Sequence, residues 1–331
     1  MSYQNFWAER RVLVTGASGL LGLWITKLLL ASGAYVSAFV KQENRESRFI
    51  EFDDQIRQNA TRLSIVAGRI ESKSSVIRLL ESNEHEIVFH LAALNLNRGL
   101  PPNGAWHLFD TNVKGTYNLL EACRLRSKEI GCLVMASSEE VSALAKNQIR
   151  SHPYHTSKIC AELICKVYRE TYGMKIATVR LPNVYGGGDV NTARLVPSAI
   201  QDILLGISPV LRNLDSTERK FLYAEDAARL FLLVAENQIV GNKQHSDFHV
   251  SALESISTLA LVERLIQISG SKGLKPVLND ERQVVDDSGQ RGPRAIEASD
   301  VDWTPSVSLQ EGLEKTFNWY KNNMSWLSGN R

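Results

Sequence analysis

The chain has 331 residues, of which 44% are hydrophobic, so it can bury a large core in one domain or in two closely associated domains. Its formal net charge of +2 is too close to zero to indicate a nucleic-acid partner. Residues 1–11 contain no apolar stretch typical of a secretion signal, and the apolar segment 20–31 is interrupted by Lys27 and too short to span a bilayer. We therefore expect a cytoplasmic protein that binds neither nucleic acid nor membrane. The four cysteines form no Cys-x-x-Cys pair, and no metal site is predicted.

Through the first half of the chain, short apolar runs alternate with stretches in which apolar residues recur at helical spacing. The apolar runs predict strands at 11–15, 35–40, 63–66, 87–91, 132–137 and 176–180. The helical spacing predicts helices near 20–32, 72–82, 105–127 and 153–173. This alternation is typical of α/β proteins, and we predict a Rossmann-type, doubly wound parallel sheet with helices on both faces. Ligands of such sheets bind beyond the carboxyl ends of the strands.

The alternation becomes less regular after Arg180, where residues 186–219 are rich in Gly, Asn, Asp and Pro. The later elements that we expect are a strand near 246–250 and helices near 194–206, 225–236, 256–269 and 308–323. This part of the chain predicts a smaller, mixed C-terminal lobe that binds the substrate. The predicted domains are a dinucleotide-binding domain at 1–180, to which 221–250 returns, and a substrate-binding lobe at 181–220 and 251–331.

The first predicted strand leads into a glycine-rich segment, V-L-V-T-G-A-S-G-L-L-G at residues 12–22. Gly16 allows a tight turn, Gly19 lets the backbone approach a phosphate, and Gly22 lets the following helix pack close to the strand. The dipole and the free N–H groups of that helix then face the anion. A purely structural turn is the alternative interpretation, but the position at the first strand–helix junction favours a dinucleotide site.

Tyr154 is the only one of the nine tyrosines that is followed four residues later by a lysine, Lys158. On a helix the two residues share a face, so the ammonium can lie beside the phenol and favour the phenolate. Tyr154 would then act as a base toward a sugar or alcohol hydroxyl. One such pair can arise by chance, but the predicted helix also follows a strand that ends in Ser137 and Ser138, where a hydroxyl could bind the same substrate oxygen.

Further segments join these two motifs: H-L-A-A at 90–93, T-N-V-K-G-T at 111–116, Y-H-T-S-K at 154–158 and R-L-P-N-V-Y-G at 180–186. Together they resemble the extended short-chain dehydrogenase/reductase family, and within it the NAD(P)-dependent nucleotide-sugar epimerases and dehydratases. The resemblance extends over nearly the whole chain, including the C-terminal segment 308–320. It is specific to the family and much less specific to the reaction.

The resemblance implies a role for individual residues. The cofactor would be bound by Gly16, Ser18, Gly19, Leu20, Gly22, Lys41, Ala92, Ala93, Asn112 and Lys158. The catalytic residues would be Ser138, Glu139, Glu140, Tyr154 and Lys158. The substrate diphosphate would be held by Asn183 and Arg219, and Arg291 and Arg294 are candidates for a second cation. For Arg219 the alternative is a solvated charge beside Glu218.

The glutamates that follow Ser138 favour one reaction within this branch. The M-A-S-S-E-E-V segment is similar to the place where 4,6-dehydratases of the family carry a pair of acidic residues. Oxidation at C4 acidifies the C5 proton of the sugar, so Glu140 is expected as the C5 base and Glu139 as the acid for the departing C6 hydroxyl. Family decarboxylases also have a glutamate at the position of Glu140, so an epimerase, 4-keto-sugar reductase or decarboxylase stays an alternative. A more remote alternative is a protein that senses a dinucleotide and catalyses no reaction.

The end of the second predicted strand bears on the choice of cofactor. NAD enzymes usually have an acidic residue there for the ribose diol, but this chain has Lys41, with Arg45 nearby. A cation suits a 2′-phosphate, so NADP is the preferred expectation, with NAD as the alternative. The helices at 105–127 and 153–173 also carry more apolar residues than one sheet face needs, and the resemblance implies that they pair in a homodimer.

Overall fold

The computed structural model describes residues 6–41, 46–82, 84–95, 104–126, 129–139, 141, 153–211, 218–241, 246–249, 254–278 and 303–328. These residues form two compact units. The first contains the described residues of Met1–Leu181, Ala227–Val250 and Gly292–Thr304, and the second contains those of Pro182–Asp226, Ser251–Arg291 and Pro305–Arg331. Each unit contains its own β-structure.

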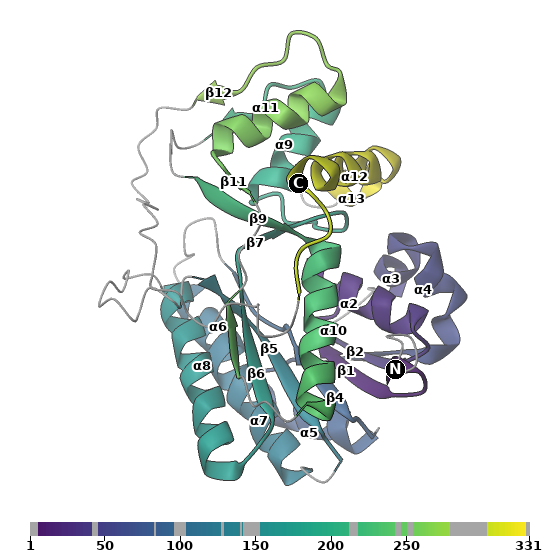
Figure 1. The fold of residues 1–331 in the computed structure, drawn as a ribbon, viewed down its shortest axis with the longest axis vertical. Coiled ribbons are helices and arrows are strands. Elements are labelled where there is room, and N and C mark those ends of the chain that lie inside the picture. Colours follow the sequence, from purple (N-terminus) through teal and green to yellow (C-terminus); the bar gives the residue numbers. More distant parts are fainter. Residues whose placement is uncertain are drawn as a thin grey trace. The chain divides into compact units, whose positions relative to one another are not determined.

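The first unit is built on a parallel sheet whose seven described strands follow the order β10-β6-β5-β4-β1-β2-β3 (Figure 1). The strands are β1 (Arg11–Thr15), β2 (Tyr35–Val40), β3 (Leu63–Ala67), β4 (Ile87–His90), β5 (Cys132–Ser138), β6 (Ile176–Leu181) and β10 (Asp247–His249). The chain first builds outward from β1 to β2 and β3, and then crosses over to β4 on the other side of β1. Doubly wound sheets bind their ligands at this reversal. The predicted α/β fold with a Rossmann-type sheet is confirmed.

Helices cover both faces of this sheet. The helices of the first unit are α2 (Leu20–Ala31), α3 (Glu46–Phe52), α4 (Asp54–Gln58), α5 (Lys73–Ser82), α6 (Gly104–Phe109), α7 (Gly115–Leu125), α8 (Pro153–Tyr172) and, mostly within this unit, α10 (Ala224–Val240). The helix predicted at 105–127 is not uniform, because a π-helical turn, η2 (Asp110–Lys114), separates α6 from α7. Helices α3 and α4 were not predicted. None of the helices in the described part of the chain is long and apolar enough to cross a membrane.

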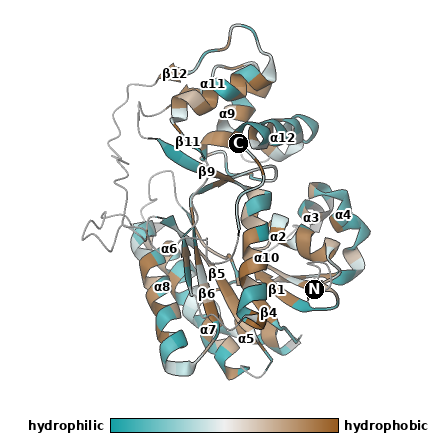
Figure 2. Ribbon diagram, viewed as in Figure 1, coloured by the Kyte–Doolittle hydropathy of each residue, from teal (hydrophilic) through white to brown (hydrophobic). Residues whose placement is uncertain are grey.

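The five central strands, β1, β2, β4, β5 and β6, are buried on both faces, which explains their nearly continuous apolar sequences, whereas the edge strand β3 is only partly buried. Successive residues of a strand point to opposite faces. On β4, Val88 packs in a cluster with the buried side chains of α5, α7 and α8. The next residue, Phe89, contacts the rings of Trp7 and Phe231, the latter on α10. Figure 2 shows the resulting hydrophobic colouring of the central strands and of α10.

The second unit contains a small mixed sheet of order β11-β9-β7, in which β7 and β9 are parallel and β11 is antiparallel. Its elements are β7 (Asn183–Tyr185), α9 (Leu195–Leu204), β8 (Val210–Leu211), β9 (Arg219–Tyr223), β11 (Ser255–Ile256), α11 (Thr258–Ser269), β12 (Val277–Leu278), α12 (Leu309–Asn322) and α13 (Ser325–Ser328). Ser257 and Ser308 cap α11 and α12 by accepting backbone N–H groups. The expected mixed C-terminal structure is therefore present.

Candidate active site

The turn between β1 and α2 depends on glycine for two reasons. Gly16 has φ +67°, and a Cβ there would lie 2.8 Å from the backbone of Ala92, in the loop after β4. A Cβ on Gly22 would lie 2.5 Å from the carbonyl oxygen of Gly16, so α2 packs directly against the turn. Larger residues would force the two loops and the helix apart. The turn, the helix and the loop after β4 thus form one compact cradle.

The N-terminus of α2 in this cradle is suited to an anion. Among the described residues, α2 has no side-chain cap and no acidic residue in its first turn, and its N-cap is the exposed Gly19. A helix N-terminus of this kind attracts phosphate through its backbone N–H groups and its dipole. Ser18 and Leu20 are buried on either side of Gly19, whereas Ala93 is exposed in the neighbouring loop. This geometry fits the diphosphate of a dinucleotide.

Hydrogen bonds fix His90, the last residue of β4, in one tautomer. Thr15 Oγ1 lies 3.2 Å and 3.3 Å from the backbone nitrogens of Leu91 and Ala92, which donate to it. The Thr15 hydroxyl proton therefore points to Nδ1 of His90, 2.9 Å away, and Nε2 carries the ring proton and donates to Thr116 Oγ1 at 3.0 Å. Burial, and then the charge of Lys158, lower the pKa of His90 to about 3, so the ring stays neutral.

The same chain of hydrogen bonds continues to the helix that carries Tyr154. Thr116 donates to the carbonyl oxygen of Asn112, which lies in the π-helical turn. The Asn112 side chain accepts from the backbone nitrogen of Leu94 at 2.8 Å and donates to Ser157 Oγ at 2.9 Å. Ser157 in turn donates to the carbonyl oxygen of Tyr154 at 2.7 Å. Asn112 is therefore buried with its amide occupied by protein groups, and it holds the first turn of α8 in place.

Tyr154 and Lys158 lie one turn apart on α8, and the structure ties this helix to the end of β5. Lys158 Nζ donates to the carbonyl oxygen of Ala136 at 3.0 Å. Ser138 ends the same strand, Glu139 follows it, and both are partly buried. Burial lowers the pKa of Lys158 to about 8, while the neighbouring carboxylate of Glu162 acts in the opposite direction. Lys158 is thus anchored to β5 two residues before Ser138.

The predicted substrate residues that the structure describes belong to the second unit. Asn183 begins β7, is exposed, and lies on the strand next to β9. Its Nδ2 donates to the carbonyl oxygen of Lys220 at 3.4 Å. Arg219 begins β9 and is partly buried. The mixed sheet therefore places Asn183 and Arg219 on neighbouring strands.

Several predicted positions stand apart from these clusters. Lys41 is exposed directly after β2. Glu140, Arg291 and Arg294 lie outside the described residues. Within the described ranges, no group of three or more His, Cys, Asp or Glu side chains could hold a metal ion.

Sequence reasoning missed two buried polar groups next to the predicted site. His90 was visible only as the first letter of H-L-A-A, without a role. Glu162 follows Lys158 by four residues and pairs with Arg180 of β6, but the partners are on different elements. The helical spacing could have identified Glu162 as a neighbour of Lys158, whereas nothing in the sequence pattern indicates that Arg180 reaches it.

Comparison with known proteins identifies the family of the chain. The model of the NAD dependent epimerase/dehydratase family matches residues 12–250, and the chain belongs to this family. It is 26% identical to the CDP-glucose 4,6-dehydratase of Salmonella typhimurium, over 98% of this chain and 94% of that protein. It is 24% identical to a trifunctional UDP-glucose 4,6-dehydratase/UDP-4-keto-6-deoxy-D-glucose 3,5-epimerase/UDP-4-keto-L-rhamnose-reductase of Arabidopsis thaliana, over 97% of this chain but only 48% of that protein. The chain thus spans about half the length of this relative.

A solved structure shows the same fold. The dTDP-glucose 4,6-dehydratase of Bacillus anthracis, determined in complex with NAD, superposes with a TM-score of 0.77 and 21% identity. The match covers 96% of this chain and 99% of that one.

Proposed function

We propose that this protein is an NADP-preferring nucleotide-sugar 4,6-dehydratase. One observation carries the proposal: a continuous chain of hydrogen bonds runs from Thr15, at the glycine cradle, through His90, Thr116 and Asn112 to the turn of α8 that bears Tyr154. This chain of hydrogen bonds supports the proposal because it links the glycine cradle to the backbone of Tyr154 on α8. The names of the relatives supply the substrate class, a nucleotide-linked hexose.

Tyr154 accepts the proton of the C4 hydroxyl, which the Ser138 hydroxyl orients by a hydrogen bond. The Lys158 ammonium favours the phenolate because it lies one helical turn away. The dinucleotide, when bound, supplies a reversible hydride acceptor, so that the overall reaction needs no external oxidant. Gly16, Ser18, Gly19, Leu20 and Gly22 would hold its diphosphate, with Ala92, Ala93 and Lys158 beside it.

Two carboxyl groups complete the elimination. Once C4 is a ketone, the C5 proton is acidic, and Glu140 removes it as a base. Glu139 donates a proton to the C6 hydroxyl, whose C–O bond breaks, and one water leaves. C6 then takes back the hydride that was removed from C4, and C5 takes back a proton, so the cofactor would end the turnover in its starting oxidation state. Asn183 and Arg219 would hold the nucleotide diphosphate, with Arg291 and Arg294 as further cations. Lys41 would pair with the 2′-phosphate of NADP, because an exposed cation stands where NAD enzymes usually have a carboxylate.

The decisive experiment is incubation with CDP-, GDP-, dTDP- and UDP-hexoses, followed by mass spectrometry of the products. We expect loss of one water from one of these substrates without a net change in nicotinamide absorbance. An unchanged mass with altered retention would indicate an epimerase, and loss of carbon dioxide from a uronic acid a decarboxylase. Either result would overturn the dehydratase.

Tyr154→Phe supplies the matched control. It should retain cofactor binding and lose turnover by about a hundredfold or more, because only the proton acceptor is removed. Full turnover by this variant would contradict the role of Tyr154.

We also propose a homodimer. Trp106 of α6 is 82% exposed, and Leu163 and Val167 of α8 are 57% and 52% exposed. Helices that expose large apolar side chains in this way commonly pack against a second chain. Here α6 and α8 also pack against each other, so the exposed residues belong to adjoining helices.

A further inference from the structure

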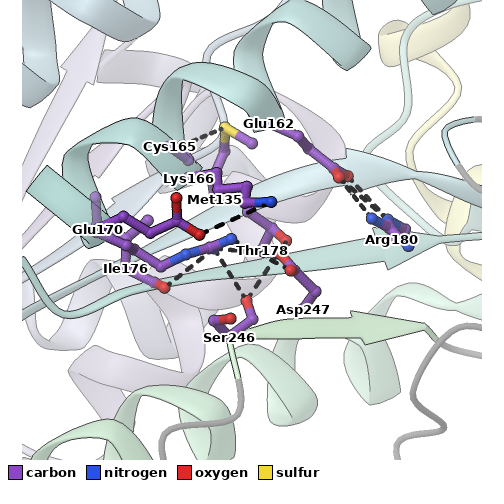
Figure 3. Close-up of polar contacts among 11 residues, drawn as sticks. Met135, Glu162, Cys165, Lys166, Glu170, Ile176, Thr178, Arg180, Ser246 and Asp247 are labelled. Carbon is purple, nitrogen blue, oxygen red and sulfur yellow. Dashed lines mark hydrogen bonds and ion pairs between the residues drawn. The ribbon is translucent and has the colours of Figure 1, made fainter.

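A buried ion pair lies one helical turn beyond Lys158. Glu162 of α8 is 8% exposed. Arg180 of β6 donates its Nε to both carboxylate oxygens, at 3.0 and 3.2 Å, and its Nη2 to Oε2 at 2.7 Å. Figure 3 shows the two side chains facing each other across the space between α8 and β6. A forked contact of this kind holds the carboxylate in a fixed orientation.

The Glu162 carboxylate also acts on Lys158, whose pKa it raises. Residues four apart on a helix are surface neighbours, so the carboxylate lies beside the lysine on the same face. Two cations, the buried Lys158 and the partly buried Arg180, therefore interact with one carboxylate. An anion that is already neutralised by a forked arginine stabilises a second cation less than an unpaired anion would.

The other charged groups around Lys158 do not replace this carboxylate. Cys165 lies further along the same helix, and His90 of β4 is neutral. Arg169 is paired with Asp247 of β10, at 3.2 Å (Figure 3). The described charged groups of η2 and α7 pair among themselves: Asp110 with Lys114, and Glu121 with Arg124. The remaining described titratable groups on the elements that pack against α8 are Glu139, at the end of β5, and the exposed His107 of α6.

We propose that Glu162 and Arg180 are positioning residues that together set how much positive charge Lys158 carries, and so how readily Tyr154 accepts a proton. The part concerning Tyr154 rests on the proposed function, whereas the part concerning Lys158 does not. Arg180 acts by limiting the share of the Glu162 carboxylate that is available to Lys158.

The proposal predicts opposite effects for the two partners. Arg180→Gln removes a nearby cation and releases the carboxylate, so the pKa of Lys158 should rise by about one unit. Glu162→Gln removes the anion, so the pKa of Lys158 should fall by about one unit. A purely structural pair would lose stability in both variants without moving the lysine in opposite directions. Arg180→Lys keeps the charge and should stay close to the parent protein.

The lysine can be titrated directly, without substrate or cofactor. Protein labelled with ¹³C at lysine Cε is followed by NMR from about pH 6 to about pH 11, and the Lys158 signal is assigned by its loss in Lys158→Arg. Glu170→Gln is the matched control, because Glu170 lies on the same helix and pairs with Lys166 at the surface. This control should leave the Lys158 titration unchanged. Backbone amide spectra establish that each variant is folded.

Shifts of the same sign in Arg180→Gln and Glu162→Gln, or no shift in either, would overturn the proposal. If Arg180→Gln does not fold, the double variant replaces it, and its lysine should titrate above that of Glu162→Gln alone. The pH dependence of turnover should move in the same direction as the lysine. If the pKa of Lys158 shifts in opposite directions in the two variants but no nucleotide sugar is turned over, the proposed function is wrong, whereas the effect of Glu162 and Arg180 on Lys158 stands.

Discussion

Acidification should destabilise the fold through two buried histidines. His85 and His90 are 2% and 3% exposed. Neither ring nitrogen of His85 has a hydrogen-bond partner among the described residues, and His90 accepts and donates only as a neutral ring. Burial, followed by the charge of Arg126, lowers the pKa of His85 from 6.5 to about 4, and the pKa of His90 falls to about 3. Both side chains are therefore neutral in the folded protein at neutral pH.

The sign and the size of the effect follow from proton linkage. The unfolded chain binds a proton at each histidine below about pH 6.5, whereas the folded chain does so only below about pH 4 or pH 3. Stability from these groups is thus fully present above pH 6.5 and is lost as the pH falls toward the folded values. At about 1.4 kcal/mol per pH unit, each histidine costs about 2 kcal/mol at pH 5, and the pair about 4 kcal/mol. That is a large part of the 5–15 kcal/mol that is typical of domains.

His85→Leu isolates half of this effect. At about pH 8 the variant should be about 1 kcal/mol more stable than the parent, because an unsatisfied polar side chain is removed. At about pH 5 the difference should grow to about 3 kcal/mol, because the titration is removed as well. Urea unfolding followed by circular dichroism at both pH values measures these free energies. His107→Gln, at an exposed histidine of α6, is the control and should change stability little at either pH. An equal gain for His85→Leu at both pH values would refute the reasoning.

Three further changes test packing, cofactor choice and assembly. Gly312→Ala places a Cβ 2.1 Å from the hydroxyl of the buried Tyr185 and should lower the free energy of unfolding by about 1–3 kcal/mol in a urea titration. Lys41→Glu should weaken NADP binding about tenfold relative to NAD in a fluorescence titration, and an unchanged ratio would remove Lys41 from the cofactor site. Light scattering at micromolar concentration should give the molar mass of a dimer for the parent protein and of a monomer for Trp106→Glu. A monomeric parent protein would contradict the interface that we place at Trp106 and Leu163.

Periodicity predicted the parallel sheet because its central strands are buried on both faces, so their apolar runs stand out from the amphipathic helices. The small sheets of the second unit were not predicted in detail, because β8, β11 and β12 contain two residues each, too few to show a period. The π-helical turn at Asp110–Lys114 was missed for a related reason: the residues around it keep a helical pattern of burial. The role of that turn becomes visible only in the hydrogen bonds of Asn112, which connect it to Leu94 and to Ser157 of α8.

The candidate site could be located from the sequence because polar residues stand at the ends of buried apolar strands. Val12–Val14 of β1 and Ile87–Phe89 of β4 are apolar and fully buried, and the buried polar residues of these strands, Thr15 and His90, stand at their carboxyl ends. Thr15 pairs with His90 across β1 and β4, and Ser137 pairs with Arg180 across β5 and β6. Because parallel strands end at the same edge of a sheet, these residues form one polar row there. A pattern of strand ends therefore predicts where the row lies. It does not predict which residues of the row form hydrogen bonds with each other, because those bonds also involve side chains of α8 and of the π-helical turn.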